Sequence, residues 1–167
     1  MPTTLYNNFI ERTSWSTSGS NSMIPAFIAY GNNSSTYVTL NTSDTIVQFS
    51  GTNNNAGGHF TTSNNRFTAP IQGLYVFHYG ATFRYSTGAG GSYNAVYPKR
   101  NGAGISYTWR ARSVPPSTNQ WTSHTGSWTI LLSTNDYVEF YEYAHVANEV
   151  ERLELETSLF GYLLKTV

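Results

Sequence analysis

The sequence predicts an all-β sandwich or jelly roll. Short apolar and aromatic segments recur along the chain, turns rich in Gly, Pro and Asn separate them, and no segment sustains a 3.6-residue apolar period. Eight to ten short strands divided by turn residues are typical of such folds. The composition agrees, since the 167 residues are 39% hydrophobic and 16% aromatic but only 11% charged. A chain of this length can form one domain with a sizeable core.

The N-terminal part of the chain divides into an extension and the first strands. Residues 1–22 are polar and end in SWSTSGSNS, so we interpret them as an extension or linker. The apolar segment 24–30 is the first predicted strand, and GNNSS ends it. Residues 45–49 form the next one, and GTNNNAGG at 51–58 is a predicted loop.

The segment FTAPIQGLYVFHY, residues 67–79, follows a short piece that starts at His59 and turns at SNN. It holds a turn at 69–73 and then an apolar and aromatic strand that begins at Leu74 and extends to Phe83. A half-buried strand alternates apolar and polar residues, and the run 74–79 does not. Both of its faces are therefore expected to be covered.

The C-terminal half contains the remaining predicted strands. Residues 93–97 and 105–110 are expected to form a hairpin around Asn101-Gly102, because Asn-Gly favours the positive φ angles of a tight turn. A Pro-rich loop, SVPPSTNQ, follows. Four later segments are predicted strands on their apolar or alternating patterns: 127–132, 137–143, 148–156 and 158–164.

Three predicted strands are apolar on both faces: 24–30, 74–79 and 159–164. In an antiparallel sandwich one face of each sheet packs on the other sheet, and the second face normally meets water. A large exposed apolar patch is rare on a monomer. The simplest cover is another copy of the chain in a closed ring. The alternative is that residues 1–22 fold back over this sheet, although their apolar content suffices only for partial cover.

A family resemblance enters at the same segment. Eight apolar, aromatic or turn positions have the spacing of the C1q-like domain signature: Phe49, Asn55, Phe60, Phe67, Gly73, Tyr75, Phe77 and Tyr79. Segments elsewhere also resemble that family, including Pro25-Ala26-Phe27 and Arg100-Asn101-Gly102. Two positions depart from its pattern, Asn135 where Gly is usual and Leu159 where Phe is usual. The chain thus resembles the globular head of complement C1q over residues 23–167.

The resemblance implies a ten-stranded jelly roll of the C1q and tumour-necrosis-factor type that assembles as a compact homotrimer. Strand alternation then assigns side chains to faces. We expect six residues in the subunit core: Phe49, Phe60, Phe67, Tyr75, Phe77 and Tyr79. Six others are expected at the trimer interface: Leu74, Val76, His78, Phe160, Tyr162 and Leu164. On the last strand alternation alone does not choose between this face and that of Leu159, Gly161 and Leu163.

No motif of enzyme chemistry is present in the sequence, so we expect no catalytic activity. No cofactor or metal is predicted either, because cysteine is absent, the four histidines are scattered and no loop has the spaced oxygen ligands of a calcium site. The net charge of zero argues against nucleic acid as a partner. No run of 18 apolar residues predicts membrane insertion, and no signal peptide is visible.

These observations favour a non-enzymatic, trimeric structural or adhesive head on a virus or phage fibre or spike, located on a virion or extracellular surface. It would recognise a host glycan or protein receptor through loops 51–58, 86–92, 99–104 and 111–120. The candidate contact residues are Tyr93, Arg100, Arg112 and Trp121. The alternatives are a secreted C1q-like ligand or pattern-recognition protein, and a bacterial or spore-surface glycan-binding module.

Overall fold

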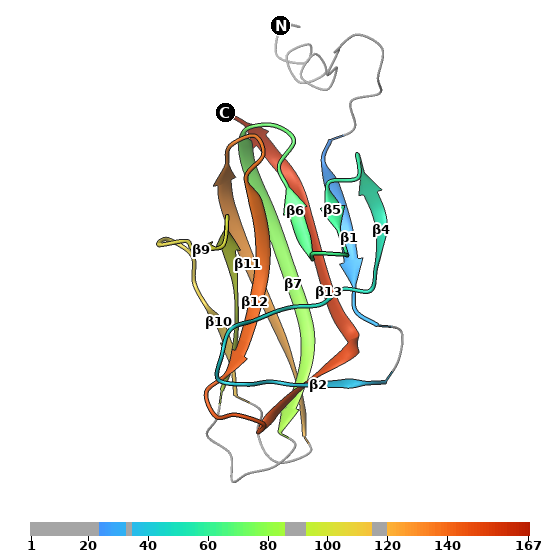
Figure 1. The fold of residues 1–167 in the computed structure, drawn as a ribbon, viewed down its shortest axis with the longest axis vertical. Coiled ribbons are helices and arrows are strands. Elements are labelled where there is room, and N and C mark those ends of the chain that lie inside the picture. Colours follow the sequence, from blue (N-terminus) through green and yellow to red (C-terminus); the bar gives the residue numbers. More distant parts are fainter. Residues whose placement is uncertain (1–23, 33–34, 86–92, 115–119) are drawn as a thin grey trace, which may run out of the picture.

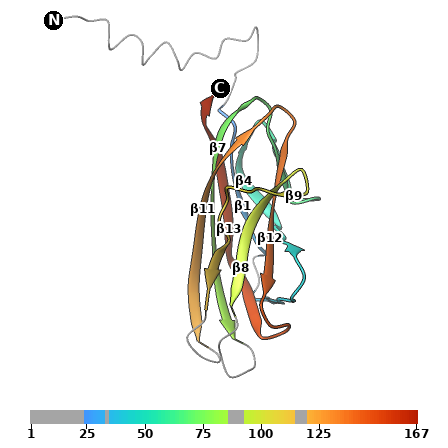
Figure 2. The ribbon, with the colours of Figure 1, turned by 90° about the vertical axis from the view of Figure 1, so that its left-hand side faces the viewer.

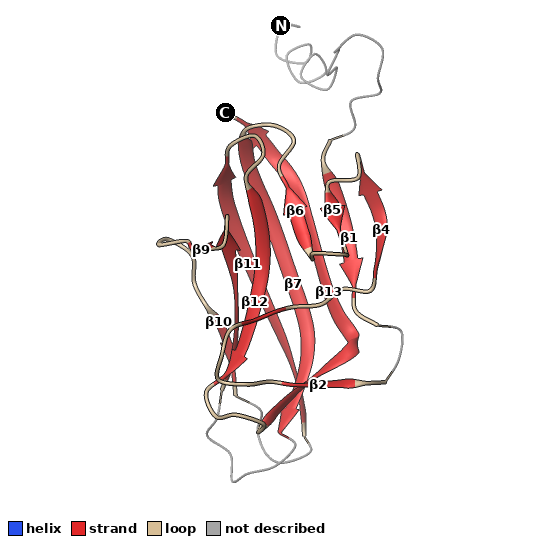
Figure 3. Ribbon diagram, viewed as in Figure 1, coloured by secondary structure: helices blue, strands red, loops and turns tan. Residues whose placement is uncertain are grey.

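The computed structural model describes residues 24–32, 35–85, 93–114 and 120–167. Within these ranges the regular elements are all strands, and none is a helix (Figure 3). The predicted all-β sandwich is therefore confirmed. The predicted extension 1–22, the loop 86–92 and residues 115–119 of the Pro-rich loop lie outside the described residues.

The described residues contain thirteen strand segments where the resemblance implied ten strands, because several are short pairings of two or three residues. In chain order they are β1 (Ala26–Tyr30), β2 (Tyr37–Thr39), β3 (Thr45–Ile46), β4 (Gly51–Ala56), β5 (Phe60–Thr61), β6 (Arg66–Thr68), β7 (Gly73–Tyr85), β8 (Asn94–Arg100), β9 (Ala103–Gly104), β10 (Ala111–Ser113), β11 (Trp121–Leu132), β12 (Tyr137–Ala144) and β13 (Val150–Thr166).

The strands form two antiparallel sheets that face each other, as the edge-on view in Figure 2 shows. The six-stranded sheet has the order β11-β7-β13-β1-β4, with β2 paired to β13. The seven-stranded sheet has the order β10-β8-β12-β6-β5, with β3 paired to β12 and β9 paired to β8. Sequence neighbours such as β12 and β13 (Figure 1) lie in different sheets, so the chain crosses repeatedly between the layers, as in a jelly roll.

The longest stretch of core comes from β7, which lies between β11 and β13 in the six-stranded sheet. Its odd-numbered residues from Tyr75 to Tyr85 all point into the sandwich and are at most 4% exposed. The even-numbered residues of the same strand point to the outer face. The segment 74–79, which is apolar on both faces, therefore lies in the middle of the six-stranded sheet with its odd-numbered residues in the core.

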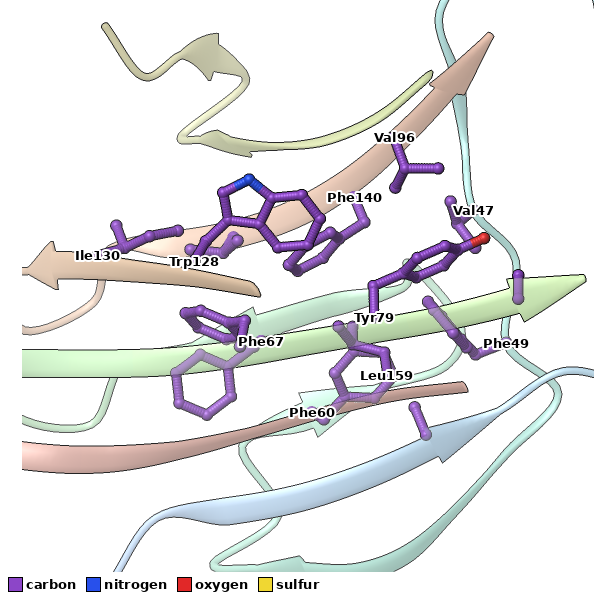
Figure 4. Close-up of a cluster of buried hydrophobic side chains, with 14 of the residues drawn as sticks. Val47, Phe49, Phe60, Phe67, Tyr79, Val96, Trp128, Ile130, Phe140 and Leu159 are labelled. Atoms are coloured by element: carbon purple, nitrogen blue, oxygen red, sulfur yellow. The ribbon is translucent and has the colours of Figure 1, made fainter. Parts of the chain in front are cut away.

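Aromatic rings fill the space between the sheets (Figure 4). The ring of Phe27 stacks on Phe60 and Phe67, with centroids 4.6 Å and 5.2 Å apart. From the other side of the core the Trp128 ring contacts Phe140 at 5.3 Å. Beside this stack β13 carries Gly161, where an added Cβ would lie 2.6 Å from the Phe27 ring. A glycine is therefore required there by the packing of the rings.

One ion pair is buried within this core. Arg152 of β13 and Glu142 of β12 are at most 1% exposed, and their Nε and Oε2 atoms are 2.8 Å apart. Arg152 also donates a hydrogen bond from Nη1 to the hydroxyl of Thr157 at 2.8 Å. Because β12 and β13 belong to opposite sheets, this pair links the two layers through the interior.

Two predicted strands at the C-terminus are one strand in the structure. β13 (Val150–Thr166) joins most of 148–156 to 158–164, and its pairing with β7 shifts register between Leu153 and Ser158. Such an irregularity changes which residues face inward. Before it the buried residues are Val150 and Arg152, Thr157 is buried within it, and after it the buried residues are Leu159, Gly161 and Leu163. The prediction of two separate strands was therefore wrong.

The other differences from the predicted strands are a polar segment that forms a strand and a predicted strand that is absent. The predicted loop at 51–58 contains edge strand β4, which pairs with β1 through backbone hydrogen bonds despite its Asn-rich sequence. The hairpin turn at Asn101-Gly102 is present, with φ angles of 52° and 77°. Its second strand is only β9, since 105–110 is a turn and an irregular segment instead of the predicted strand. In place of the predicted segment 105–110, the three residues of β10 pair with β8.

Candidate functional site

The outer face of the six-stranded sheet is apolar over one half, where the start of β7 pairs with the end of β13. Strand register brings Ile28, Phe160 and His78 into one row across β1, β13 and β7. A second row contains Tyr162 and Val76. We name this surface the apolar face and define it by the following residues, all on outward positions of the sheet: Ile28, Leu74, Val76, His78, Leu131, Phe160, Tyr162 and Leu164.

Several of these side chains remain exposed to solvent. Ile28 is 43% exposed, Phe160 42% and Leu164 55%. The His78 ring stacks on the Phe160 ring, with centroids 4.5 Å apart and an interplanar angle of 22°. A stacked imidazole and phenyl ring extend the apolar surface across the middle of the sheet. The described residues leave this surface without a covering element.

A shallow hollow of about 400 Å³ lies beside these rings, between β11, β7 and β13. His78 and Phe160 border it on one side, and Ser127 and Ser158 contribute to its lining. It forms around Gly80, an outward position of β7 that has no side chain. The apolar face thus combines the stacked rings of His78 and Phe160 with an adjacent recess, a relief that suits close packing against another surface.

The outer face of the seven-stranded sheet has a different character. Here guanidinium groups lie over tyrosine rings: Arg110 Cζ is 4.6 Å from the Tyr97 centroid, and Arg112 Cζ is 4.7 Å from that of Tyr93. We name this surface the tyrosine–arginine face and define it by five residues: Tyr93, Tyr97, Arg110, Arg112 and Tyr143. Cation–π stacking of this kind holds a guanidinium in a fixed plane.

The rings of this face form a continuous row. The Tyr143 centroid lies 6.2 Å from that of Tyr93 and 6.3 Å from that of Tyr97, both in edge-on contact. On its outer end Tyr93 stacks on His145 at 4.9 Å. The strand pairing of β10 and β12 with β8 positions these side chains, because the three strands are adjacent in the sheet. Tyr97 and Tyr143 therefore anchor the row on strands, with Tyr93 directly before β8 and His145 directly after β12.

Within the described ranges, neighbouring cations on this sheet form ion pairs, whereas the two arginines of the face do not. Lys99 pairs with Asp44 at 2.9 Å, and Arg66 pairs with Glu139 at 2.6 Å. Among the described residues neither Arg110 nor Arg112 has a carboxylate within ion-pair distance. Both side chains are exposed.

The arginines also affect the ionisation of the phenols. Partial burial acts to raise the pKa of Tyr143, but hydrogen bonds from Tyr93 and Arg110 and the charge of Arg110 outweigh it and lower this pKa. The Arg110 Nη1–Tyr143 hydroxyl distance is 3.0 Å. At Tyr97 the effect is opposite, since burial and the hydrogen bond to the Asp44 carboxylate raise the pKa. The positive charge of the tyrosine–arginine face therefore acts most strongly around Tyr143, whereas the Asp44 carboxylate offsets it at Tyr97.

The residues expected in the core and at the trimer interface can be located directly. The six core candidates, Phe49, Phe60, Phe67, Tyr75, Phe77 and Tyr79, are at most 4% exposed and belong to one cluster. The six interface candidates lie together on the apolar face. Leu159, Gly161 and Leu163, the alternative set on the last strand, point into the core. Whether the apolar face meets a neighbouring subunit stays a prediction.

The four candidate ligand contacts are not brought together. Tyr93 and Arg112 meet on the tyrosine–arginine face. Arg100 lies at the far end of β8, where it donates a hydrogen bond to the Leu131 carbonyl oxygen at 3.1 Å. Trp121 is the first residue of β11 and not part of a loop. Its ring stacks on that of Tyr37 at 5.6 Å, and both residues belong to the six-stranded sheet, not to the sheet of the tyrosine–arginine face.

Sequence reasoning missed the centre of the tyrosine–arginine face, namely Tyr97, Arg110 and Tyr143. A signal was available, because the tyrosines of the segment 137–143 all occupy odd positions, whereas its apolar residues Val138 and Phe140 occupy even ones. Such a pattern marks an aromatic outer face on a strand. The role of Arg110 could not be found in this way, because its partners come from strands distant in sequence.

The described part of the chain contains no cluster of three or more histidine or acidic side chains that could hold a metal ion. It also contains no helix long and apolar enough to span a membrane.

Comparison with known proteins identifies the family. A family profile described as C1q domain matches residues 26–164. A comparison with curated protein sequences finds no match. Domains of the C1q and tumour-necrosis-factor type are generally non-enzymatic and extracellular, and they typically form trimers that bind ligands or receptors.

Solved structures show the same fold at low sequence identity. The globular domain of zebrafish complement 1qA protein superposes with a TM-score of 0.61 at 15% identity, covering 87% of this chain and all of that one. The Eiger TNF of S. frugiperda gives 0.62 at 12% identity, with 86% and 94% covered. Murine APRIL gives 0.60 at 15% identity, with 85% and 100% covered. The fold and the matched profile together show that this chain belongs to the C1q domain family.

Proposed function

We propose that the chain is a non-enzymatic head domain that assembles as a homotrimer and presents its seven-stranded sheet to an external ligand. The observation that carries this proposal is the apolar face, where Ile28, Phe160 and Leu164 remain 42–55% exposed on one side of the sandwich. Exposed apolar patches of this kind mark interaction sites. The family typically assembles in threes, which supports a trimer over other closed rings.

Assembly through the apolar face has a consequence for the opposite side. The two sheets are stacked face to face, so a partner that covers the outer face of the six-stranded sheet leaves the outer face of the seven-stranded sheet directed outward (Figure 2). The tyrosine–arginine face then lies on the surface of the trimer. The proposed head thus has one face for assembly and another for recognition.

We further propose that this head belongs to an appendage of a virus or phage, where it contacts a host surface. The composition supports this proposal, since only 11% of residues are charged and the polar remainder is rich in Asn, Ser, Thr and Gly. The genes that flank the coding gene test this placement. Capsid or tail genes are expected there. A signal peptide and collagen-like repeats in the complete gene product would instead identify a secreted C1q-like ligand.

Light scattering coupled to gel filtration tests the assembly. The expected mass is three times the 18.6 kDa of one chain, constant across a hundredfold range of micromolar concentrations. A single species at 18.6 kDa would overturn the trimer.

A further inference from the structure

We infer that the tyrosine–arginine face binds acidic saccharides, whose carboxylate or sulfate groups pair with Arg110 and Arg112. This inference deepens the proposed function, because it names a ligand class for the outward-facing sheet. It is argued from the charges and contacts of the face itself, so it applies to a single subunit as well as to a trimer.

The first step is the charge of the face. Four cations lie on this side of the sheet, and two of them, Lys99 and Arg66, have carboxylate partners within 3 Å. Arg110 and Arg112 have none among the described residues. An exposed guanidinium presents a planar fork of N–H donors that matches the oxygens of a carboxylate or sulfate. Charge complementarity therefore selects an anionic ligand.

The second step is pre-organisation. Arg112 lies over the ring of Tyr93, and Arg110 lies over Tyr97 while donating to the hydroxyl of Tyr143. These contacts limit the rotamers available to two long side chains before any ligand arrives. Less side-chain entropy is then lost on binding than at two free surface arginines. The arrangement favours recognition over a purely solvated surface charge.

The third step is spacing. Arg112 lies in β10 and Arg110 directly precedes this strand. Their guanidiniums lie over Tyr93 and Tyr97, whose ring centroids are 6.2 Å and 6.3 Å from that of Tyr143 between them. Phenolic hydroxyls lie between and beside them, at Tyr143 and Tyr93. A ligand with separated anionic groups and hydroxyls between them satisfies both kinds of partner. Acidic saccharides have this chemistry.

The low charge argues against nucleic acid as the occupant. Binding of phosphate backbones without sequence recognition depends on many lysine and arginine contacts, and its affinity falls steeply with salt. Here two unpaired guanidiniums lie on a chain with a formal net charge of zero. Each of the stacked tyrosines already has a guanidinium over its ring, so free ring faces for base stacking are few.

Binding of defined polysaccharides by the intact chain tests the inference, measured by calorimetry or biolayer interferometry in 150 mM salt. The two anionic probes are dextran sulfate and oligogalacturonate, and neutral dextran of equal length is the control. Binding of either anionic probe without binding of neutral dextran is expected, and the two probes separate sulfate from carboxylate recognition. Equal binding of neutral dextran, or binding of neither anionic probe, would overturn the inference. So would equally tight binding of single-stranded DNA or polyglutamate, because either would show unselective capture of polyanions.

The matched variants are Arg112→Gln and Lys165→Gln. Each removes one positive charge, but Lys165 is an exposed residue near the end of β13 in the other sheet. Loss of a charge-assisted contact should weaken binding of the preferred probe about tenfold in Arg112→Gln. Lys165→Gln should bind as the unsubstituted chain does. Equal affinities of both variants would contradict the assignment to this face.

Arg110→Gln provides a second test should Arg112→Gln lower the thermal unfolding midpoint. Light scattering of the same samples separates this inference from the trimer proposal. A trimer that binds neither anionic probe refutes only the ligand class. A monomer that binds an anionic probe and loses binding in Arg112→Gln refutes only the assembly.

Discussion

Replacing Phe160 by glutamate should dissociate the proposed trimer. Phe160 is 42% exposed at the centre of the apolar face and stacks on His78. A phenylalanine that buries about 200 Å² in full thus offers roughly 85 Å² to a neighbour, or about 2 kcal/mol at 25 cal/mol per Å². Three subunits lose about 6 kcal/mol together, before the cost of placing three carboxylates in an apolar interface.

This loss converts into a measurable concentration shift. About 6 kcal/mol corresponds to more than four decades in the dissociation constant of a trimer, which has units of concentration squared. The concentration of half dissociation should therefore rise at least 100-fold. Light scattering over a dilution series measures it. Trp109→Glu is the matched control, since Trp109 is 85% exposed and lies outside the apolar face. If Phe160→Glu remains trimeric at the same concentrations as the control, the reasoning about this face is refuted.

Three further predictions concern stability. Gly161→Ala should destabilise the fold by roughly 1–3 kcal/mol, because the added methyl would lie 2.6 Å from the Phe27 ring; chemical denaturation measures this. Arg152→Met should cost about 3–5 kcal/mol in the same assay, since it leaves the Glu142 carboxylate buried without its partner. Burial, and then the charge of Glu139 and the hydrogen bond to it, raise the pKa of Tyr141 from its ordinary value of 10.0 to about 12. Its contribution to stability is therefore complete below pH 10 and is lost as the pH rises toward 12, so Tyr141→Phe should flatten that decline.

Each of these predictions has its own control. Gly104→Ala adds a methyl group with no atom within 4 Å, so it should leave stability nearly unchanged. The double variant Arg152→Met, Glu142→Met removes both charges and should recover most of the stability lost in the single variant. Equal stability of Arg152→Met and the unsubstituted chain would show that the ion pair contributes nothing. For the tyrosine, an unchanged alkaline slope in Tyr141→Phe would contradict the assigned cause.

The candidate site could be predicted only in part. The interface candidates on β7, such as Val76, follow from alternation within a single strand, whereas on β13 alternation left the face of Phe160 and that of Leu159 as two choices. Tyr93 and Arg112 were also named from sequence, but with Trp121, which the fold places in the other sheet. Membership of one binding surface depends on which strands are adjacent, and local pattern does not contain that information.

The sequence by itself determined the all-β class, the family signature and the two-faced character of β7, because these depend on local composition, fixed spacing and the two-residue period of a strand. Only the tertiary structure decided which residues of β13 face inward, because a bulge changes the buried positions from even-numbered ones such as Arg152 to odd-numbered ones such as Leu159. It also decided the pairing of Asn-rich β4 with β1. It also decided that Arg110 meets Tyr97 and Tyr143. Each of these results depends on contacts between segments distant in the chain, and such contacts form through backbone pairing and packing that no single segment specifies.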